Sequence, residues 1–420
     1  MSPQVFDKLK TLAEAAKYDV SCASSGTTRK NSAKSLGSAS GWGICHSFTE
    51  DGRCVSLLKI MLTNHCIYDC AYCLNRRSND VPRATFSVSE LVELTIEFYR
   101  RNYIEGLFLS SGVVRNADYT MERIVRVAKD LRLIHKYNGY IHLKSIPGAS
   151  RELVAEAGLY ADRLSVNIEI PSEENLKIIA PEKDYQSVFK PMHYIQQGFI
   201  QGKEERKKYR HAPRFAPAGQ STQMVIGATP EDDKQILSLA SNLYQRPAMK
   251  RVYYSGYIPV NDYDTRLPAL KTPPLVRENR LYQADWLMRF YQFKVDEIVD
   301  ELNPNLDLEI DPKLAYALRH PELFPVNINT ADYELILRIP GIGVKSAQLI
   351  VSSRRYGKLT SDHLKKMGVV MKRAQYFITC NELSRFTVQE SRPEYIRKIL
   401  TENPKQKKKD DRQLTINFEE

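Results

Sequence analysis

The sequence predicts an α/β protein, a partial barrel of six β/α units followed by a small all-α domain. Apolar runs of strand length alternate six times with helical patterns between residues 55 and 293, as parallel strands with helical crossovers do. Beyond residue 303 the pattern changes to short helices around a glycine-containing turn. We therefore expect an irregular N-terminal lead-in at 1–53, the barrel at 54–300, the helical domain at 301–390 and a basic tail at 391–420.

The strands of the barrel are expected at 55–63, 106–111, 140–145, 163–169, 221–227 and 251–257. Helices are expected from 88, at 119–136 and 150–157, in segments up to about 197, from 229 and at 281–293. Two helix starts have recognisable caps, because Ser87 and Glu90 have capping-box spacing and Thr229 precedes a proline. In the lead-in we expect a short helix at 5–17 and a Ser/Gly/Thr-rich loop at 21–43.

Composition limits the class of protein. With 420 residues, 42% hydrophobic, the chain is typical of globular proteins rather than of disordered ones. The formal net charge of +11 fits a polyanionic partner or simple solubility. The sequence has neither an apolar run of membrane-spanning length nor a signal-peptide pattern, and we expect no membrane association. The seven cysteines fit a reducing compartment, so we expect a cytoplasmic protein.

Three of these cysteines, Cys66, Cys70 and Cys73, form a C-x₃-C-x₂-C motif directly after the first expected strand. Three thiolates on one loop can bind three irons of a four-iron cluster and leave the fourth open, and open metal positions are typical of catalytic sites. In α/β barrels chemistry occurs at the C-terminal ends of the strands, where this loop lies. The alternative is a zinc site with His65 as the fourth ligand.

A second group of cysteines, Cys22, Cys45 and Cys54, has looser spacing. These residues fit either an auxiliary cluster or buried free thiols, and isolated cysteines are more often the latter.

The motif, with Tyr72 before its last cysteine, resembles the signature of radical S-adenosylmethionine (SAM) enzymes. The runs 56–64, 103–112 and 281–286 resemble one subfamily, the DNA modification/repair radical SAM proteins, over most of the chain. The resemblance implies a [4Fe–4S] cluster whose fourth iron is chelated by SAM. It also implies reductive cleavage of SAM to a 5′-deoxyadenosyl radical that abstracts hydrogen, and a one-electron donor such as flavodoxin or ferredoxin.

The resemblance also implies SAM contacts at the strand ends. Ser110, Ser111 and Gly112 occupy the place where the superfamily often has Gly-Gly-Glu, so hydroxyls or backbone groups must replace the acid. Asn167 and Glu169 interrupt an apolar strand, which fits either contacts with SAM or substrate or an internal polar network.

Further cofactor-binding candidates come from the other strands. The segment with Gln223, Ile226 and Gly227 resembles the one that holds adenine in this superfamily. Tyr72 belongs to the signature itself. His142 and Lys144 are candidates at the third strand, with a polar barrel core as the alternative.

The helical domain contains Leu337-Arg-Ile-Pro-Gly-Ile-Gly-Val-Lys-Ser-Ala347, which resembles a helix-hairpin-helix that binds the DNA backbone. Glycines in such a turn let backbone amides approach a phosphate. The candidate nucleic-acid-binding residues are Pro340, Gly341, Gly343, Lys345, Arg354 and Arg355. A hairpin used for protein packing is the alternative.

Tyr253, Tyr254 and Tyr257, with Arg251, end the sixth expected strand. They fit stacking on an extruded base as well as they fit ordinary packing.

The tail carries Lys407, Lys408 and Lys409 and ends in a peptide that resembles the bacterial sliding-clamp motif. In that interpretation Leu414, Ile416 and Phe418 fill a pocket on the clamp and Gln413 sets the register. The alternative is a terminal strand that docks on its own protein.

Together these features predict a radical SAM enzyme that generates a 5′-deoxyadenosyl radical to modify or repair DNA. RNA modification is the alternative among enzymes, because the hairpin and the basic charge fit RNA too. An alternative of a different class is a non-catalytic Fe–S protein that binds nucleic acid and senses redox state.

Overall fold

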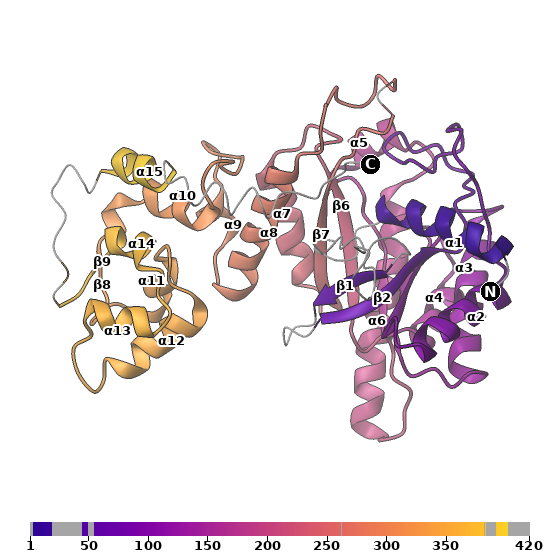
Figure 1. Cartoon of the computed structure of the whole chain (residues 1–420), viewed down its shortest axis with the longest axis horizontal. Helices are drawn as coiled ribbons and strands as arrows, with labels where there is room; N and C mark the ends of the chain where they lie inside the picture. Colours follow the sequence, from indigo (N-terminus) through magenta and orange to yellow (C-terminus); the bar gives the residue numbers. More distant parts are fainter. Residues whose placement is uncertain are drawn as a thin grey trace, which may run out of the picture. The chain divides into compact units, whose positions relative to one another are not determined.

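The computed structural model describes residues 3–18, 44–48, 54–261, 263–381, 383 and 392–401. The expected loop at 21–43 and most of the basic tail lie outside these residues. The chain forms two compact units (Figure 1). The first consists of Met1–Glu231 with Asn242–Pro274, and the second of Asp232–Ser241 with Leu275–Glu420.

A seven-stranded sheet in the order β1 to β7 forms the centre of the first unit. Strands β2 to β7 are all parallel, each paired with the next in sequence, which confirms the six parallel strands predicted from the apolar runs. The strands are β1 (Ile44–Phe48), β2 (Cys54–Met61), β3 (Gly106–Ser110), β4 (Tyr140–Lys144), β5 (Arg163–Ser165), β6 (Gln220–Ile226) and β7 (Met249–Gly256).

Strand β1 was not predicted, because its sequence, Ile-Cys-His-Ser-Phe, has little apolar periodicity. It forms through antiparallel pairing with β2, a contact that local sequence does not encode.

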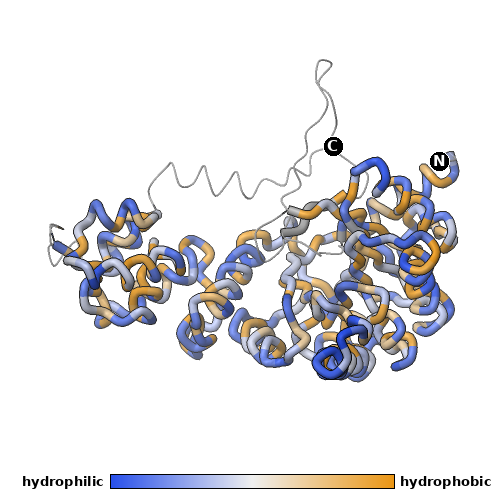
Figure 2. Tube along the Cα trace, turned by 90° about the horizontal axis from the view of Figure 1, so that it is seen from below, coloured by the Kyte–Doolittle hydropathy of each residue, from blue (hydrophilic) through white to orange (hydrophobic). Residues whose placement is uncertain are grey.

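The helices of the first part of the chain follow the predicted alternation. They are α1 (Pro3–Ala15), the 3₁₀ turn η1 (Ala16–Tyr18), α2 (Val88–Arg100), α3 (Ala117–Leu133), α4 (Arg151–Tyr160), α5 (Glu173–Ile179), α6 (Tyr185–Lys208) and α7 (Asp233–Tyr244). Helix α2 has the predicted capping box, in which Ser87 Oγ accepts from the Glu90 amide and the Glu90 carboxylate accepts from the Ser87 amide. The tube in Figure 2 alternates between hydrophobic and hydrophilic residues, as in helices that bury one face.

Several predicted boundaries were wrong. Helix α6 continues to Lys208, beyond the expected end at about 197, and the helix expected at 281–293 begins at Leu275. Helix α7 begins at Asp233 and not after Thr229, because Asp232 caps it by accepting from the Gln235 amide at 2.7 Å. Strand β5 ends at Ser165 and not at residue 169, because the backbone leaves the extended region, and Glu169 has a left-handed φ of 67°.

The second unit is mainly helical. Its remaining elements are α8 (Leu275–Phe290), α9 (Val295–Ile298), α10 (Pro312–Arg319), η2 (Pro321–Leu323), α11 (Tyr333–Arg338), α12 (Val344–Ser353), α13 (Ser361–Lys366), α14 (Met371–Ala374), η3 (Gln375–Phe377) and α15 (Pro393–Thr401). A short parallel pair of strands, β8 (Val326–Asn327) and β9 (Ile378–Thr379), departs from the all-α expectation.

Helix α8 was expected to be the last helix of the barrel, but it packs against α10 and belongs to the second compact unit. That unit has its own core, which includes Ile328, Leu337, Ile350 and Leu364, all fully buried. Among the described residues, the structure contains no helix with the length and apolarity needed to cross a membrane.

Candidate active site

The three cysteines lie on the loop that follows β2, at the C-terminal edge of the parallel sheet. Neighbouring segments hold this loop by its backbone. The Ile67 amide donates to Val113 O at 2.8 Å, and the Ala71 amide donates to Ile179 O at 2.7 Å. The loop is thus attached to the segment after β3 on one side and to the end of α5 on the other.

Gly112 shows how closely the segment after β3 approaches the cysteine loop. A Cβ atom at this position would lie 2.2 Å from the carbonyl oxygen of His65 and 3.3 Å from the Cβ of Cys66. The next amide, that of Val113, donates to the sulfur of Cys66 at 3.5 Å. The structure therefore gives Gly112 a steric reason to be glycine, next to the first cysteine.

Two polar side chains that the sequence analysis missed bind the backbone of this loop and of the residues that flank it. The fully buried Asn261, after β7, donates to Ala71 O at 2.5 Å and to Cys73 O at 3.2 Å. The Arg83 guanidinium donates to four backbone carbonyls, at 2.5–2.9 Å, from residues 64, 75, 76 and 79. Neither residue belongs to a recognisable motif, so only the tertiary structure reveals this function.

Most of the predicted cofactor-binding residues line one cavity of the first unit. These are Cys66, Cys70, Cys73, Tyr72, Ser111, Gly112, Asn167, Glu169 and Gln223, together with Lys144 and Tyr257. They come from segments at the C-terminal ends of β2 to β7, and parallel strands bring these ends to one edge of a sheet. The cavity is therefore built by the topology from residues that are far apart in the sequence.

Four other candidates are not among the residues that line the cavity. Ser110 and Ile226 are fully buried within β3 and β6. Gly227 has a φ of 83°, and a Cβ there would lie 3.0 Å from Pro274 Cγ. The His142 ring packs edge-on against Phe108, with centroids 4.5 Å apart, as in the polar-core alternative.

Glu169 lies between two lysines in this cavity. Its Oε1 is 3.8 Å from Nζ of Lys144 and 3.8 Å from Nζ of Lys183. Lys183 also donates to the Tyr72 hydroxyl at 3.2 Å, so it links the cysteine motif to the acid. Sequence analysis did not identify Lys183, because it precedes α6 outside any strand end. Asn167 donates to Gln223 Oε1 at 3.3 Å, which joins two of the predicted residues.

The donor set fits an iron–sulfur cluster with a bound polar cofactor. Burial raises the pKa of the Cys73 thiol to about 12, with Cys70 adding to the effect, and burial likewise raises the pKa of Cys70. Cluster assembly must therefore displace these protons. Ser145 lines the same cavity as the cysteines. Its hydroxyl is buried without a hydrogen-bond partner among the described residues, so it can bind a polar group of a cofactor.

Among the residues that the structure describes, no three His, Cys, Asp or Glu side chains form a site for a metal ion. In a cubane each thiolate binds its own iron, so three cysteines need not converge on one point. Cys45 lies on β1 and Cys54 begins β2, whereas Cys22 lies outside the described residues, and the auxiliary-cluster hypothesis stays a prediction.

The tyrosines at the end of β7 are buried. Tyr254 and Tyr257 are at most 2% exposed, and Tyr253 is 8% exposed. Of the three, Tyr257 lines the cavity with the cysteines. This burial favours the packing alternative over stacking on an extruded base.

In the second unit, α11 and α12 are joined by a turn at 339–343. Gly341 has a φ of 88°, and a Cβ there would lie 2.7 Å from Val370 O, so both conformation and space favour glycine. Gly343 is the N-cap of α12, which has no side-chain cap. Pro340, within the turn, is buried.

The basic candidates near this turn differ in their surroundings. Lys345 and Arg355 are exposed. Arg354 instead donates to Ile328 O at 3.1 Å and to Ala331 O at 2.6 Å, so its guanidinium fastens the preceding loop. For the expected contact with phosphate, the Arg354 guanidinium would have to give up these hydrogen bonds to the backbone. The clamp-like peptide with Gln413, Leu414, Ile416 and Phe418 lies outside the described residues, as do Lys407, Lys408 and Lys409.

A known family matches part of the first unit. Residues 60–201 match the model of the Radical SAM superfamily. A structure of HydG, a maturase of the [FeFe]-hydrogenase, is similar with 15% identity and a TM-score of 0.41, covering 54% of this chain and 48% of that one. This chain therefore spans about half the length of that structure.

Two further solved structures are similar. HydG from Carboxydothermus hydrogenoformans has 10% identity and a TM-score of 0.41, and the match covers 76% of this chain and 70% of that one. The cobalamin-dependent S-adenosylmethionine radical enzyme OxsB has 11% identity and a TM-score of 0.30, and the match covers 79% of this chain and 59% of that one. Among curated proteins, none matches this chain.

The matched residues include all three cysteines of the loop and the strands β3 to β5. The cofactors of the superfamily are a [4Fe–4S] cluster and SAM, and its enzymes need a one-electron donor. Residues 60–201 therefore match a radical SAM superfamily domain, and Cys66, Cys70 and Cys73 of this segment line the cavity described above.

Proposed function

We propose that this protein is a radical SAM enzyme that modifies or repairs DNA. The observation that carries the proposal is the shared cavity, in which the three cysteines and polar side chains from four strand ends line one space. When bound there, the cluster and SAM supply reductive cleavage of SAM and abstraction of a hydrogen atom from the substrate.

The residues of the chain have separate tasks in this proposal. Cys66, Cys70 and Cys73 bind three irons. Glu169 accepts hydrogen bonds from the SAM ribose, and Lys144 and Lys183, each with Nζ 3.8 Å from its Oε1, orient the carboxylate.

Other groups complete the SAM site. Ser111 replaces the acid that the superfamily often has at this position. Its hydroxyl donates to Gly112 O at 2.7 Å, which leaves its oxygen lone pairs to accept from the SAM amino group. Val225, Ile146 and Tyr257 form apolar walls that exclude water from the reacting centre.

Nucleic acid as the substrate is supported by the second unit and by charge. The turn with Gly341 and Gly343 ends at the uncapped start of α12, beside the exposed Lys345. Backbone amides at such a position bind phosphate, and the chain carries a formal charge of +11. We further propose flavodoxin or ferredoxin as the electron donor.

Isotope transfer tests the function. Reduced, reconstituted protein is incubated with SAM and DNA deuterated at defined carbons, and the 5′-deoxyadenosine product is analysed by mass spectrometry. Deuterium in this product would support the proposal and identify the position. Transfer from labelled RNA, with none from DNA, would reassign the substrate. A protein that never cleaves SAM, although its cluster is intact and nucleic acid is present, is instead the redox sensor.

We also propose that the peptide at 413–418 binds the sliding clamp. Deletion of these residues should abolish retention on immobilised clamp and leave SAM cleavage unchanged. Equal retention of the shortened protein would contradict this proposal.

A further inference from the structure

A groove in the second unit combines aromatic side chains with the hairpin turn. One wall is a face of α8, and the floor is the turn at 341–343 with Ser346. Pro312 and Lys313 at the start of α10 and Val370 also line it. All of these residues belong to the second compact unit.

The wall of α8 presents residues at helical spacing. Asn279, Tyr282, Gln283 and Trp286 recur every three or four positions and therefore share one face. Trp286 is 51% exposed, an unusual exposure for the largest apolar side chain. Its ring packs on Phe290, which is 42% exposed, with centroids 4.3 Å apart. This face thus offers a broad aromatic surface to a ligand.

Tyr291 lines the same groove as the exposed tryptophan and the hairpin turn. Its hydroxyl lies beside Gly343, where a Cβ atom would be 3.6 Å from it. The Trp286 ring, packed on Phe290, loses little conformational freedom on binding, which favours stacking. The aromatic surface and the turn before α12 therefore belong to one groove.

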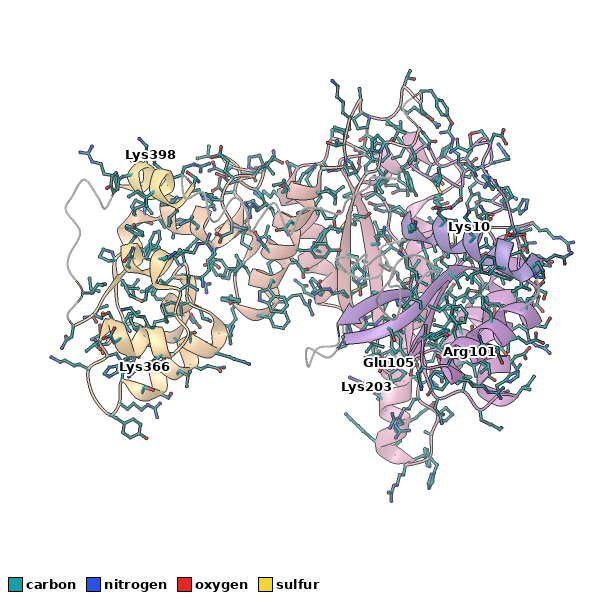
Figure 3. The ribbon with its side chains drawn as sticks, viewed as in Figure 1. Lys10, Arg101, Glu105, Lys203, Lys366 and Lys398 are labelled. Atoms are coloured by element: carbon teal, nitrogen blue, oxygen red, sulfur yellow. The ribbon has the colours of Figure 1, made fainter. Side chains whose placement is uncertain are left out.

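Exposed lysines lie next to lining residues in the sequence and favour a polyanionic ligand. Lys345 follows the floor of the groove and Lys372 precedes Arg373 on its rim, and both lysines are exposed. Lys366, labelled in Figure 3, is exposed at the end of α13, two residues before Gly368, which also lines the groove. Asp311, the acid of the groove, is paired with Arg373.

We propose that this groove binds an unpaired nucleotide of DNA, with the base stacked on Trp286 and the neighbouring phosphates beside Lys345, Lys366 and Lys372. Bases within a duplex have both faces covered, so a single aromatic surface in a groove can stack only on a base that is unpaired or extruded. The inference rests on the proposed function for the choice of nucleic acid, and it deepens that function by naming single-stranded or locally opened DNA as the bound form.

Fluorescence of Trp286 tests the proposal directly. The sequence has two tryptophans, so Trp42→Phe leaves Trp286 as the single emitter. A single-stranded thymidine oligonucleotide should quench this emission with saturation, and a duplex of equal length should not. Unchanged emission while anisotropy of labelled DNA reports binding would overturn the proposal, as would equal quenching by the duplex.

Variants provide the second arm. Trp286→Leu should weaken single-strand binding about tenfold, the loss expected for one base–aromatic stack, whereas Trp286→Phe should stay close to the parent. Tyr209→Ala, at an exposed aromatic residue of the first unit, is the matched control and should have no effect. If Trp286→Leu binds as the parent does, with native circular dichroism, the groove is not the site.

The two proposals fail in distinguishable ways. Deuterium transfer from DNA without quenching of Trp286 would overturn the groove assignment and leave the proposed function standing. Absence of both transfer and binding of any nucleic acid would overturn the proposed function. Tighter quenching by a uridine oligoribonucleotide would overturn DNA as the occupant in favour of RNA.

Discussion

The side-chain amide of Asn261 donates a hydrogen bond of 2.5 Å to the carbonyl oxygen of Ala71 and so joins the segment after β7 to the cysteine loop. Asn261 is completely buried and also accepts from the Asn79 side chain at 2.7 Å. The cysteine loop is thus held by a residue 190 positions away in the sequence. This connection is a direct target for testing how the site is held.

Asn261→Ala should lower the free energy of unfolding by about 2–3 kcal/mol, because buried carbonyls lose their donor. The cluster should also be lost faster, since Cys70 and Cys73 flank one of these carbonyls. Chemical denaturation and the iron content per chain after reconstitution measure both effects. Asn138→Ala, at an exposed asparagine of the same unit, should change neither. Full cluster retention in Asn261→Ala would contradict the assigned role.

Serine at any of Cys66, Cys70 or Cys73 should abolish SAM cleavage, because an iron loses its thiolate ligand. The measurements are visible absorbance of the cluster and formation of 5′-deoxyadenosine after anaerobic reduction. Cys380→Ser, in the second unit, is the control and should keep both signals. Retention of cleavage in any of the three loop variants would exclude that cysteine as a ligand.

Glu169→Gln should weaken SAM binding about tenfold, the effect of about 1.4 kcal/mol for a lost charge-assisted hydrogen bond. The amide is a poorer acceptor for ribose hydroxyls, and it leaves Lys144 and Lys183 without their shared anion. Equilibrium binding of SAM to unreduced, reconstituted protein measures the change. Glu173→Gln, on the exposed side of α5, should bind SAM as the parent does. Equal affinities in both variants would remove Glu169 from the SAM site.

Gly341→Ala should weaken DNA binding while SAM cleavage in the first unit continues. The substitution forces a side chain into a left-handed φ of 88° and within 2.7 Å of Val370 O, so the turn must move. We expect a loss of stability of about 1–2 kcal/mol in the second unit from the backbone conformation alone. Gly357→Ala is a matched control, because a Cβ there meets nothing within 4 Å. Competition binding at two salt concentrations distinguishes the variants, and equal affinity would rule out the turn as a contact.

Lys313 should make the stability of the second unit depend on pH. Its ammonium donates to Ile342 O at 2.6 Å inside the fold. Burial lowers its pKa to about 7 against the opposing charge of Asp311, and Arg338 and Arg373 lower it further. Because the folded pKa is below the unfolded value, the unfolded chain binds more protons between these two pKa values. Stability should therefore rise as pH increases from about 7 towards the ordinary lysine pKa of about 10.4.

Lys313→Met tests this dependence. The variant should lose the rise in that pH window, measured by denaturation at several pH values. A parent protein whose stability is flat across the window would contradict the lowered pKa. Lys345→Met, at an exposed lysine of the same unit, should keep the rise.

Local chemistry in the sequence was enough to predict the six parallel strands and the capping box at Ser87 and to single out the three cysteines, because periodicity and motif spacing are encoded by neighbouring residues. The same reasoning predicted that side chains at strand ends would meet, since parallel strands share one edge. Only the tertiary structure assigned Lys183 to Glu169 and Asn261 to the cysteine loop. Each of these contacts joins segments that pack together only after folding, and hydrogen bonds between such segments leave no periodic signal in the chain.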